Sequence, residues 1–259
     1  MVGLYAVQRI VGRKLQKVIM QHMADQMKTP PRSVQELASR LHGVGPVKDK
    51  KVAAMTLSAR LSSRAQVAKD YQGHAKLFPE KGGLAEAAHQ FAFDSSPLNK
   101  SLRETGKIDF ENLKQMDRLF GTKYSKHDWG AFTAATQAKL SKKVVTYRGV
   151  SDRIGDKVLK SKGYTAKGFV SQTMDSSMAA HFTDRGGSKT ILEIITSKGA
   201  VIGNVGRKQR LLQSEIVSAH GSKYKVLGVD VVGVKAANLL GKIDDKRQPY
   251  RVITLKQVS

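Results

Sequence analysis

The stretch VVTYRGV, residues 144–150, combines a strand-like composition with one arginine beside a glycine. Five of its seven residues are β-branched or aromatic, which is typical of a buried β-strand. Similar short stretches rich in Val and Ile follow from Ser141 to the C-terminus, and glycines separate them. One helix interrupts them, because Asp175 or Ser176 is placed to cap a turn leading into Met178–Phe182. We therefore predict that the second half of the chain forms a sheet.

The chain before this stretch has a helical pattern instead. Apolar residues recur at helical spacing up to Leu140, and prolines and glycines separate the segments. Gly106 and Gly121 stand where left-handed helix C-caps are expected. Residues 4–27 predict a basic amphipathic helix, either docked on the domain or serving as a sorting, packaging or membrane-surface segment. Helices first and strands later favour an α+β fold with an antiparallel or mixed sheet.

The composition limits the class of protein. The 259 residues contain no cysteine, which excludes disulfide frameworks, zinc–thiolate sites and thiol nucleophiles. The formal net charge is +24, from 45 Lys and Arg against 21 Asp and Glu, and both halves of the chain share it. Such a charge predicts polyanionic partners: nucleic acid, an acidic membrane or an acidic protein surface. No apolar run approaches the ~20 residues that span a bilayer, and no secretory leader is recognisable, so we expect a cytoplasmic protein.

Three short motifs carry polar residues through the strand-rich half. They are YRG (147–149), then GFVSQT (168–173) with AAHF (179–182), and finally QSE (213–215). Each motif alone is common in ordinary sheets. Together and in this order they resemble the mono-ADP-ribosyltransferases of the arginine–serine–glutamate class, although SQT stands where Ser-Thr-Ser is commoner. The segment PLNKSLRETG (97–106) also looks like the helical lead-in of the toxin and bacteriophage branches.

The resemblance covers the chain from about Ser95 to the C-terminus. It implies two parts, a helical, basic N-terminal region at residues 1–94 and an ADP-ribosyltransferase-like catalytic domain at residues 95–259. For the fold, it implies a split β-sandwich of two packed, mainly antiparallel sheets with flanking helices. NAD would bind in the cleft between the sheets as a substrate. No metal is expected, because the seven histidines lack ligand spacing.

The resemblance also implies roles for five residues. Arg148 would bind the pyrophosphate of NAD, since a guanidinium binds phosphate oxygens in a planar fork. Gly149 beside it would let NAD approach the backbone. Ser171 would orient Glu215 and line the nicotinamide–ribose pocket, while Thr173 would support the site by hydrogen bonding. Glu215 would bind the ribose 2′-hydroxyl and stabilise the oxocarbenium-like transition state as nicotinamide leaves.

Gln213 completes the predicted catalytic set and bears on the acceptor. In the family, Glu-x-Glu goes with arginine acceptors, whereas Gln-x-Glu goes with asparagine in clostridial Rho-modifying toxins and with guanine in pierisin-like enzymes. Gln213 donates and accepts hydrogen bonds but takes no proton, so an amide or a nucleobase acceptor is expected. The preceding loop, 203–212, would face the acceptor with Arg207, Lys208 and Arg210 and no acid. The acceptor is therefore expected to be nucleic acid or a protein bound to it.

Other interpretations remain open from the sequence. The enzyme is expected to be an effector, toxin or phage enzyme, acting in a host cytoplasm or packaged in a virion. The alternative class is a non-catalytic basic protein that binds nucleic acid or builds a virion. NAD hydrolysis with water as the acceptor would share the site and differ only in product. On the helix after the serine strand, Phe182 is expected in the core and His181 is expected to be structural.

Overall fold

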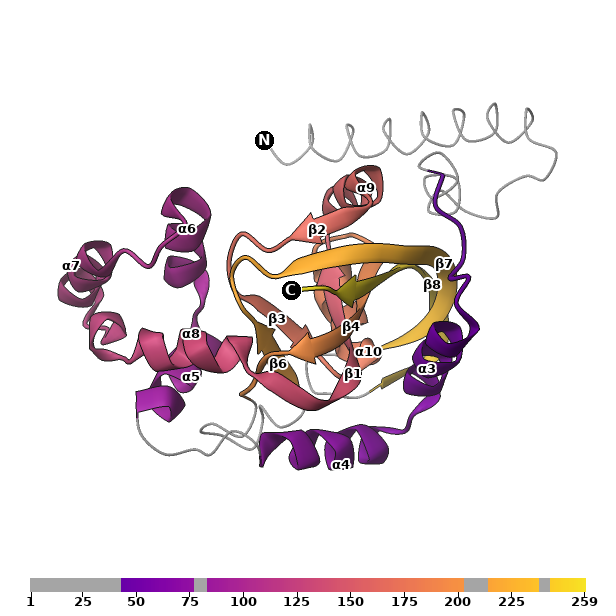
Figure 1. Ribbon diagram of the computed structural model, residues 1–259, viewed down its shortest axis with the longest axis horizontal. Helices are drawn as coiled ribbons and strands as arrows, with labels where there is room; N and C mark the ends of the chain where they lie inside the picture. The colour runs from indigo at the N-terminus through magenta and orange to yellow at the C-terminus, as the bar shows by residue number, and fades with distance from the viewer. Residues whose placement is uncertain (1–42, 77–82, 203–213, 238–242) are drawn as a thin grey trace.

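The computed structural model describes residues 43–76, 83–202, 214–237 and 243–259. The basic amphipathic helix predicted for residues 4–27 lies outside this part of the chain. Helices precede a mixed sheet (Figure 1), which confirms the predicted α+β class. Within the described ranges, no helix combines the length and the apolar character that crossing a bilayer requires.

The helices that precede the sheet start and end at capping residues. Asp109 and Asp128 each accept a backbone N–H at a helix start, at 3.0 Å and 2.8 Å. Gly106 and Gly121 have φ values of 74° and 63° at the C-caps, as predicted, because glycine adopts this conformation without a Cβ penalty. These helices are α3 (Lys50–Leu61), α4 (Arg64–Ala75), α5 (Gly83–Phe93), α6 (Ser96–Thr105), α7 (Phe110–Phe120), η1 (Tyr124–Lys126) and α8 (Trp129–Gln137).

The described strands form one hydrogen-bonded sheet in the order β2-β7-β8-β4-β1-β3-β6-β5. All neighbouring strands are antiparallel except the parallel pair β4 and β8. Two helices interrupt the strands, α9 (Asp152–Ser161) and α10 (Ser176–Arg185), and Asp175 caps α10 by accepting the Ser177 N–H at 2.9 Å. The strands are β1 (Lys139–Val150), β2 (Gly163–Thr165), β3 (Val170–Thr173), β4 (Thr190–Lys198), β5 (Ala200–Val201), β6 (Glu215–Ser218), β7 (Lys223–Ala237) and β8 (Ile243–Gln257).

The sheet divides into two parts between β1 and β3. Strand β1 pairs with β4 along most of its length, whereas β1 and β3 are in register at the single pair Tyr147 and Thr173. Strands β2, β7, β8, β4 and β1 therefore form one part, and β3, β6 and β5 form the other. The split expected from the resemblance takes this form, with one short hydrogen-bonded contact between the two parts of a single sheet.

Buried side chains on both faces hold helices against the sheet. Along β4, Ile191 contributes to the cluster under α10 and α3, and the next residue, Leu192, contributes to the cluster under α9. The helices α5, α6 and α8 form a third cluster, in which the Phe132 ring lies 5.2 Å from Phe169 at the start of the GFVSQT strand. These aromatic contacts fix the three-stranded part against the helical part of the chain.

Helix α3 is attached to the sheet by a buried ion pair. Arg60 donates two hydrogen bonds to Glu193 on β4, at 2.6 Å and 2.7 Å, and Glu193 is 0% exposed. Just before α3, the carbonyl of Gly45 accepts the N–H of Val229 on β7 at 2.9 Å. At Gly228, a Cβ would lie 2.6 Å from the backbone nitrogen of Val47, so only glycine fits there. Residues 43–61 are therefore packed directly on the sheet.

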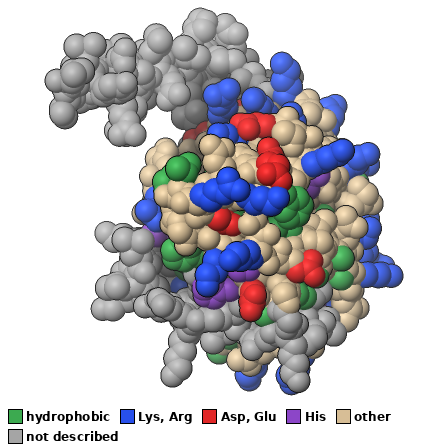
Figure 2. All heavy atoms as spheres, turned by 90° about the vertical axis from the view of Figure 1, so that its left-hand side faces the viewer, with side chains coloured by type: hydrophobic (Ala, Val, Ile, Leu, Met, Phe, Trp, Pro, Cys, Tyr) green, Lys and Arg blue, Asp and Glu red, His purple; other side chains and the backbone are tan. Residues whose placement is uncertain are grey.

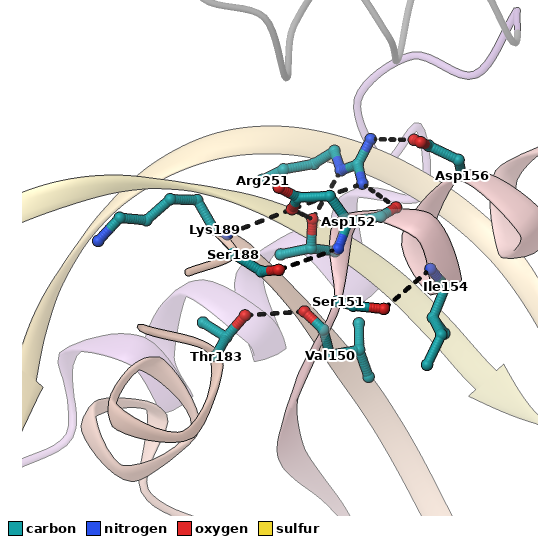
Figure 3. A network of polar contacts seen from close by, with 10 residues as sticks. Val150, Ser151, Asp152, Ile154, Asp156, Thr183, Ser188, Lys189 and Arg251 are labelled. Carbon is teal, nitrogen blue, oxygen red and sulfur yellow. Dashed lines mark hydrogen bonds and ion pairs between the residues drawn. The ribbon is translucent and has the colours of Figure 1, made fainter. Parts of the chain in front are cut away.

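A second buried arginine fastens helix α9 to the sheet (Figure 3). Arg251 on β8 is 2% exposed, and its guanidinium donates to Asp156 at 2.5 Å, to the Asp152 carbonyl at 2.9 Å and to Thr190 at 3.0 Å. A Cβ at Gly155 would lie 2.5 Å from this guanidinium, so glycine leaves the room that the arginine occupies. The network holds the turn that follows β1 and thereby the end of the strand that carries the YRG motif.

The buried His74 makes stability depend on pH. Its side chain on α4 is 2% exposed, and neither ring nitrogen has a hydrogen-bond partner among the described residues. Burial lowers the pKa of His74 below 6.5 and Lys142 lowers it further, while Asp70 acts in the opposite direction. The unfolded chain then binds more protons, so this stability is complete above the ordinary histidine pKa and is lost as the pH falls below it.

We expect the free energy of unfolding to fall as the pH is lowered from 7.5 to 5, because His74 then takes up a proton more readily in the unfolded chain. Urea unfolding at the two pH values should show a smaller loss in His74→Leu than in the unaltered chain. Part of the remaining pH dependence of stability should come from His127, because burial lowers its pKa as well. Replacement of the half-buried His220 by glutamine is the control. If the free energy of unfolding changed equally with pH in His74→Leu and in the control, His74 would not be a source of the pH dependence.

Candidate active site

A pocket of about 230 Å³ lies where β1, β3 and β6 meet. It is located at the junction between the two parts of the sheet, so residues from both parts contribute to it. The pocket brings together Arg148, Ser171 and Glu215, which the sequence places far apart. Its lining consists of Tyr147, Arg148, Gly149, Ser171, Gln172, Thr173, Ala179, Phe182 and Glu215.

Arg148 is oriented toward the three-stranded part of the sheet. Its guanidinium nitrogen Nη1 donates a hydrogen bond to the backbone carbonyl of Ser171 at 2.7 Å. The side chain is half-buried, because β1 is a central strand flanked by β4 and β3. The arginine is therefore held by a contact across the junction, and its charge faces the pocket.

Ser171 and Glu215 are hydrogen-bonded to each other on neighbouring strands. The Ser171 hydroxyl donates to Oε1 of Glu215, and both residues are half-buried. The residue before the glutamate, Ser214, has φ 44°, a left-handed conformation that is uncommon outside glycine. Its carbonyl accepts the N–H of Met174 at 3.1 Å, so the backbone turns sharply and enters β6 at Glu215. Local strain of this kind occurs where a functional side chain is oriented.

Gln172 connects four strands on the side of β3 opposite Ser171. It is 2% exposed, and its amide nitrogen donates to Ser218 at 2.7 Å. Its side-chain carbonyl accepts from Thr196 at 2.7 Å and from the Thr146 hydroxyl. The amide thus ties β3 to β1, β4 and β6 where the two parts of the sheet share one backbone register pair. This satisfied polar cluster gives a physical reason for glutamine at the centre of the SQT motif.

Thr173 supports the adjoining helix. It is buried, it is in register with Glu215 across β3 and β6, and its hydroxyl accepts the N–H of Asp175 at 3.0 Å. Asp175 is the N-cap of α10, so the threonine couples the pocket strand to the start of that helix. The role of Thr173 in binding NAD stays a prediction.

Helix packing requires glycine at position 149, which also lines the pocket. A Cβ at this position would lie 2.3 Å from the carbonyl oxygen of Ala179 and 2.7 Å from the backbone nitrogen of Thr183, both on α10. Neither backbone atom can move without shifting the helix. We expect Gly149→Ala to lower the free energy of unfolding by about 1–3 kcal/mol or more.

Chemical denaturation measures this effect, and Gly73→Ala on α4 is the matched control. A Cβ at Gly73 meets nothing within 4 Å, so alanine should there stabilise the helix by about 0.5–1 kcal/mol. The packing explanation is wrong if the two substitutions change stability in the same direction.

The expectation that Phe182 lies in the core is wrong. The side chain is 48% exposed and lines the pocket, while its neighbours Ala179, Ala180 and Thr183 on α10 are buried against the sheet. Helical spacing does not separate a residue that packs on a sheet from one that borders the opening beside it. The ring lies 5.8 Å from that of His181, which is half-buried.

Asn99 is a site-supporting residue that the motifs do not identify. Its side-chain oxygen on α6 accepts the N–H of Phe169 at 2.7 Å. A Cβ at Gly168 would lie 2.6 Å from the same oxygen, which explains the glycine that opens GFVSQT. The PLNKSLRETG segment therefore positions the strand that carries Ser171. No single-residue signal in the sequence indicates a contact across such a separation.

Four predicted residues of the site are not placed by the structure. Gln213 and the loop residues Arg207, Lys208 and Arg210 lie outside the described residues. Their predicted acceptor-facing role stays a prediction.

The described part of the pocket offers one cation and one anion in a partly buried setting. Arg148 suits a phosphate, and Glu215 suits a hydroxyl donor or a developing positive charge. Ser171 contacts both, through its carbonyl to the arginine and through its hydroxyl to the glutamate. The serine therefore sets the relative position of the two charges.

No protein-family model matches the sequence, and no curated protein is significantly similar to it. Solved structures are similar to it in fold. Plx2a, an ADP-ribosyltransferase toxin from Paenibacillus larvae, has a TM-score of 0.51 and 12% identity, covering 76% of this chain and 96% of that one. The C3 exoenzyme of Clostridium limosum has a TM-score of 0.49 and 12% identity, covering 77% and 97%. For an ADP-ribosyltransferase from Clostridium botulinum the TM-score is 0.48 and the identity 14%, covering 77% and 98%.

The similarity to Plx2a shows that the chain has the fold of an ADP-ribosyltransferase toxin. The matched share of this chain exceeds what residues 95–259 contribute, so the similarity extends into the preceding region. The contacts of α3 with the sheet agree with this extension.

Proposed function

We propose that this protein is an NAD-dependent mono-ADP-ribosyltransferase that acts as an effector or toxin. The observation that carries the proposal is the pocket in which Arg148, Ser171 and Glu215 meet at the junction of the two parts of the sheet. The toxin-like fold supports it. The residues present fit NAD, because the pocket offers a guanidinium for the pyrophosphate and a carboxylate for the ribose.

In this reaction the glycosidic bond between the ribose C1′ and the nicotinamide nitrogen breaks. The bonding electron pair leaves with nicotinamide, which becomes neutral, so no general acid is needed. Glu215 accepts a hydrogen bond from the ribose 2′-hydroxyl and stabilises the positive charge that develops on the ribose. The acceptor then forms a bond to C1′ and loses a proton. Arg148 holds the pyrophosphate throughout, and the Ser171 hydroxyl keeps the Glu215 carboxylate in position.

We further propose that the acceptor is a nucleobase or an amide, on nucleic acid or on a protein associated with it. Gln213, two residues before Glu215, would hydrogen-bond to the acceptor, and the cations Arg207, Lys208 and Arg210 would attract a polyanion. The net charge of +24 supports an acidic partner. The catalytic part would comprise residues 95–259.

Nicotinamide release from NAD by the full chain tests the reaction, with and without a cell extract. A second arm uses NAD labelled in the adenylate, followed by separation of protein, RNA and small molecules. Label on RNA or protein identifies the acceptor class, and free labelled ADP-ribose identifies NAD hydrolysis instead. If no nicotinamide is released under any of these conditions, the enzymatic proposal is wrong, and the non-catalytic alternative replaces it.

A further inference from the structure

Five exposed lysines lie on or beside strands β7 and β8, and none of them lines the NAD pocket. Lys225 and Lys256 are direct cross-strand partners on β7 and β8, and Lys223 lies on the same face as Lys225, because Tyr224 between them is buried. Lys162 ends α9, and its carbonyl accepts the N–H of Val226 at 3.2 Å. Lys48, just before α3, lines a hollow of about 330 Å³ together with Lys162 and Lys225. We call this set the lysine cluster: Lys48, Lys162, Lys223, Lys225 and Lys256.

No acidic side chain forms an ion pair with the lysine cluster in the part of the chain that the structure describes. None of the five side chains makes an ion pair or a side-chain hydrogen bond within the described residues. Asp49 also lines the hollow, where its carboxylate accepts the N–H groups of Lys51 and Val52 at the start of α3 at 2.9 Å and 3.2 Å. One carboxylate against the three lysines of the lining leaves the hollow with a net positive charge. Among the described residues this net charge is not neutralised, and it suits a bound anion.

Two features of the cluster work against folding. Like charges directly opposite each other on paired strands repel, and Lys225 and Lys256 are such a pair. Lys162 has φ 52°, a left-handed conformation that favours glycine or asparagine at a helix C-cap. Lysine at both places costs stability in the free protein, and a bound polyanion would offset the repulsion.

We propose that the lysine cluster binds the phosphate backbone of nucleic acid. Lysine offers a point charge to phosphate and reads no base sequence, so such a surface attracts any phosphodiester chain. A membrane-binding surface would add aromatic or large apolar side chains that insert among lipids. The residues that line the hollow include no aromatic residue, and none of their large apolar side chains is strongly exposed. The chemistry therefore favours nucleic acid over a lipid surface.

The face in Figure 2, which is the left-hand side of Figure 1, shows a mixed distribution of charge among the described residues. There, in the part of the chain that the structure describes, Lys and Arg side chains are interspersed with acidic and apolar ones. Three lysines of the cluster lie on β7 and β8 and two lie beside these strands, whereas the NAD pocket lies at β1, β3 and β6. Binding at the cluster goes beyond the proposed transfer reaction and does not require it.

Fluorescence anisotropy with a labelled DNA duplex tests the proposal at several salt concentrations. The variant Lys162→Gln/Lys225→Gln/Lys256→Gln should bind at least about 10-fold more weakly at ~0.15 M salt, with a slope of log affinity against log salt smaller by about 2 to 3. Its thermal midpoint should stay the same or rise, because repulsion is removed. Its nicotinamide release from NAD should stay unchanged, so a failure of the NAD reaction leaves the binding result valid.

The matched control is Lys107→Gln/Lys123→Gln/Lys126→Gln, which removes equal charge from exposed positions in the helical part. The control should bind the duplex within about 3-fold of the unaltered chain. Equal losses in the two triple variants would mean that net charge alone drives binding and would overturn the proposal. So would unchanged binding in the cluster variant. Cluster-dependent binding to phosphatidylserine vesicles without binding to DNA would also overturn it, in favour of a membrane surface.

Discussion

Replacing Glu215 by glutamine is expected to lower the rate of nicotinamide release at saturating NAD by at least about 100-fold. The two side chains have nearly the same shape, and the side-chain carbonyl of the new glutamine can still accept the hydrogen bond from the Ser171 hydroxyl. In the proposed reaction, the substitution removes the negative charge that would face the ribose as it becomes positive. Because that positive charge develops only in the transition state, kcat should fall much more than KM rises. Steady-state kinetics with NAD measures both constants.

Ser171→Ala provides a second readout of the same pair. Loss of a hydrogen bond to an ionised group should slow the reaction by about 10- to 100-fold in the unaltered chain. In the Glu215→Gln background, the same substitution should have little further effect, because the serine acts through the glutamate. Glu104→Gln, at an exposed glutamate on α6, is the control and should be fully active. If Glu215→Gln kept its activity, the proposed role of the Glu215 carboxylate would be wrong.

The motif order in the sequence was sufficient to locate the centre of the pocket. Arg148, Ser171 and Glu215 come from three different strands, and the structure brings all three to one pocket. The α+β class and the glycine caps were also predictable, because local rules of composition and backbone conformation determine them.

The supporting residues were not predictable, because their partners are distant in the chain. Glu193 sits in the strand TILEIITSK and looks like an ordinary polar residue there. Its partner Arg60 is 133 residues away, on a helix whose local pattern gives no sign of the pairing. The exposure of Phe182 was not predictable for a related reason, since it depends on where α10 lies relative to the pocket opening. Such contacts follow from tertiary packing.

Arg60→Met is expected to have the largest effect on stability. The substitution leaves the Glu193 carboxylate fully buried, where it still accepts a hydrogen bond from the Thr254 hydroxyl on β8 at 2.9 Å. Removing one partner of a buried ion pair costs about 3–5 kcal/mol, because the other charge stays out of water without compensation. For a chain of this size the thermal midpoint should fall by on the order of 10 °C. Calorimetry or denaturant unfolding measures the loss.

Two comparisons separate the buried charge from lost packing. Glu193→Gln should cost less than Arg60→Met, because the Arg60 side chain is 18% exposed and can turn toward water. The double variant Arg60→Met/Glu193→Gln should recover most of the stability, since it contains no buried charge at this pair. Lys114→Met breaks the exposed pair with Glu111, whose side chains are 51% and 82% exposed, and should cost about 1 kcal/mol or less. If the stability loss of the double variant equalled the sum of the two single losses, Arg60 and Glu193 would not act as a buried ion pair.

Unfolding of the Arg60→Met variant also tests whether the region before residue 95 unfolds independently of the sheet. If the sheet unfolded independently of α3, Arg60→Met would shift only a minor transition and leave the main one unchanged. The ion pair, the Gly45–Val229 hydrogen bond and the close contact at Gly228 instead join residues 43–61 to β4 and β7. We therefore expect one cooperative transition that shifts as a whole. Nicotinamide release should be lost at that same lower temperature, because the pocket strand β1 pairs directly with β4.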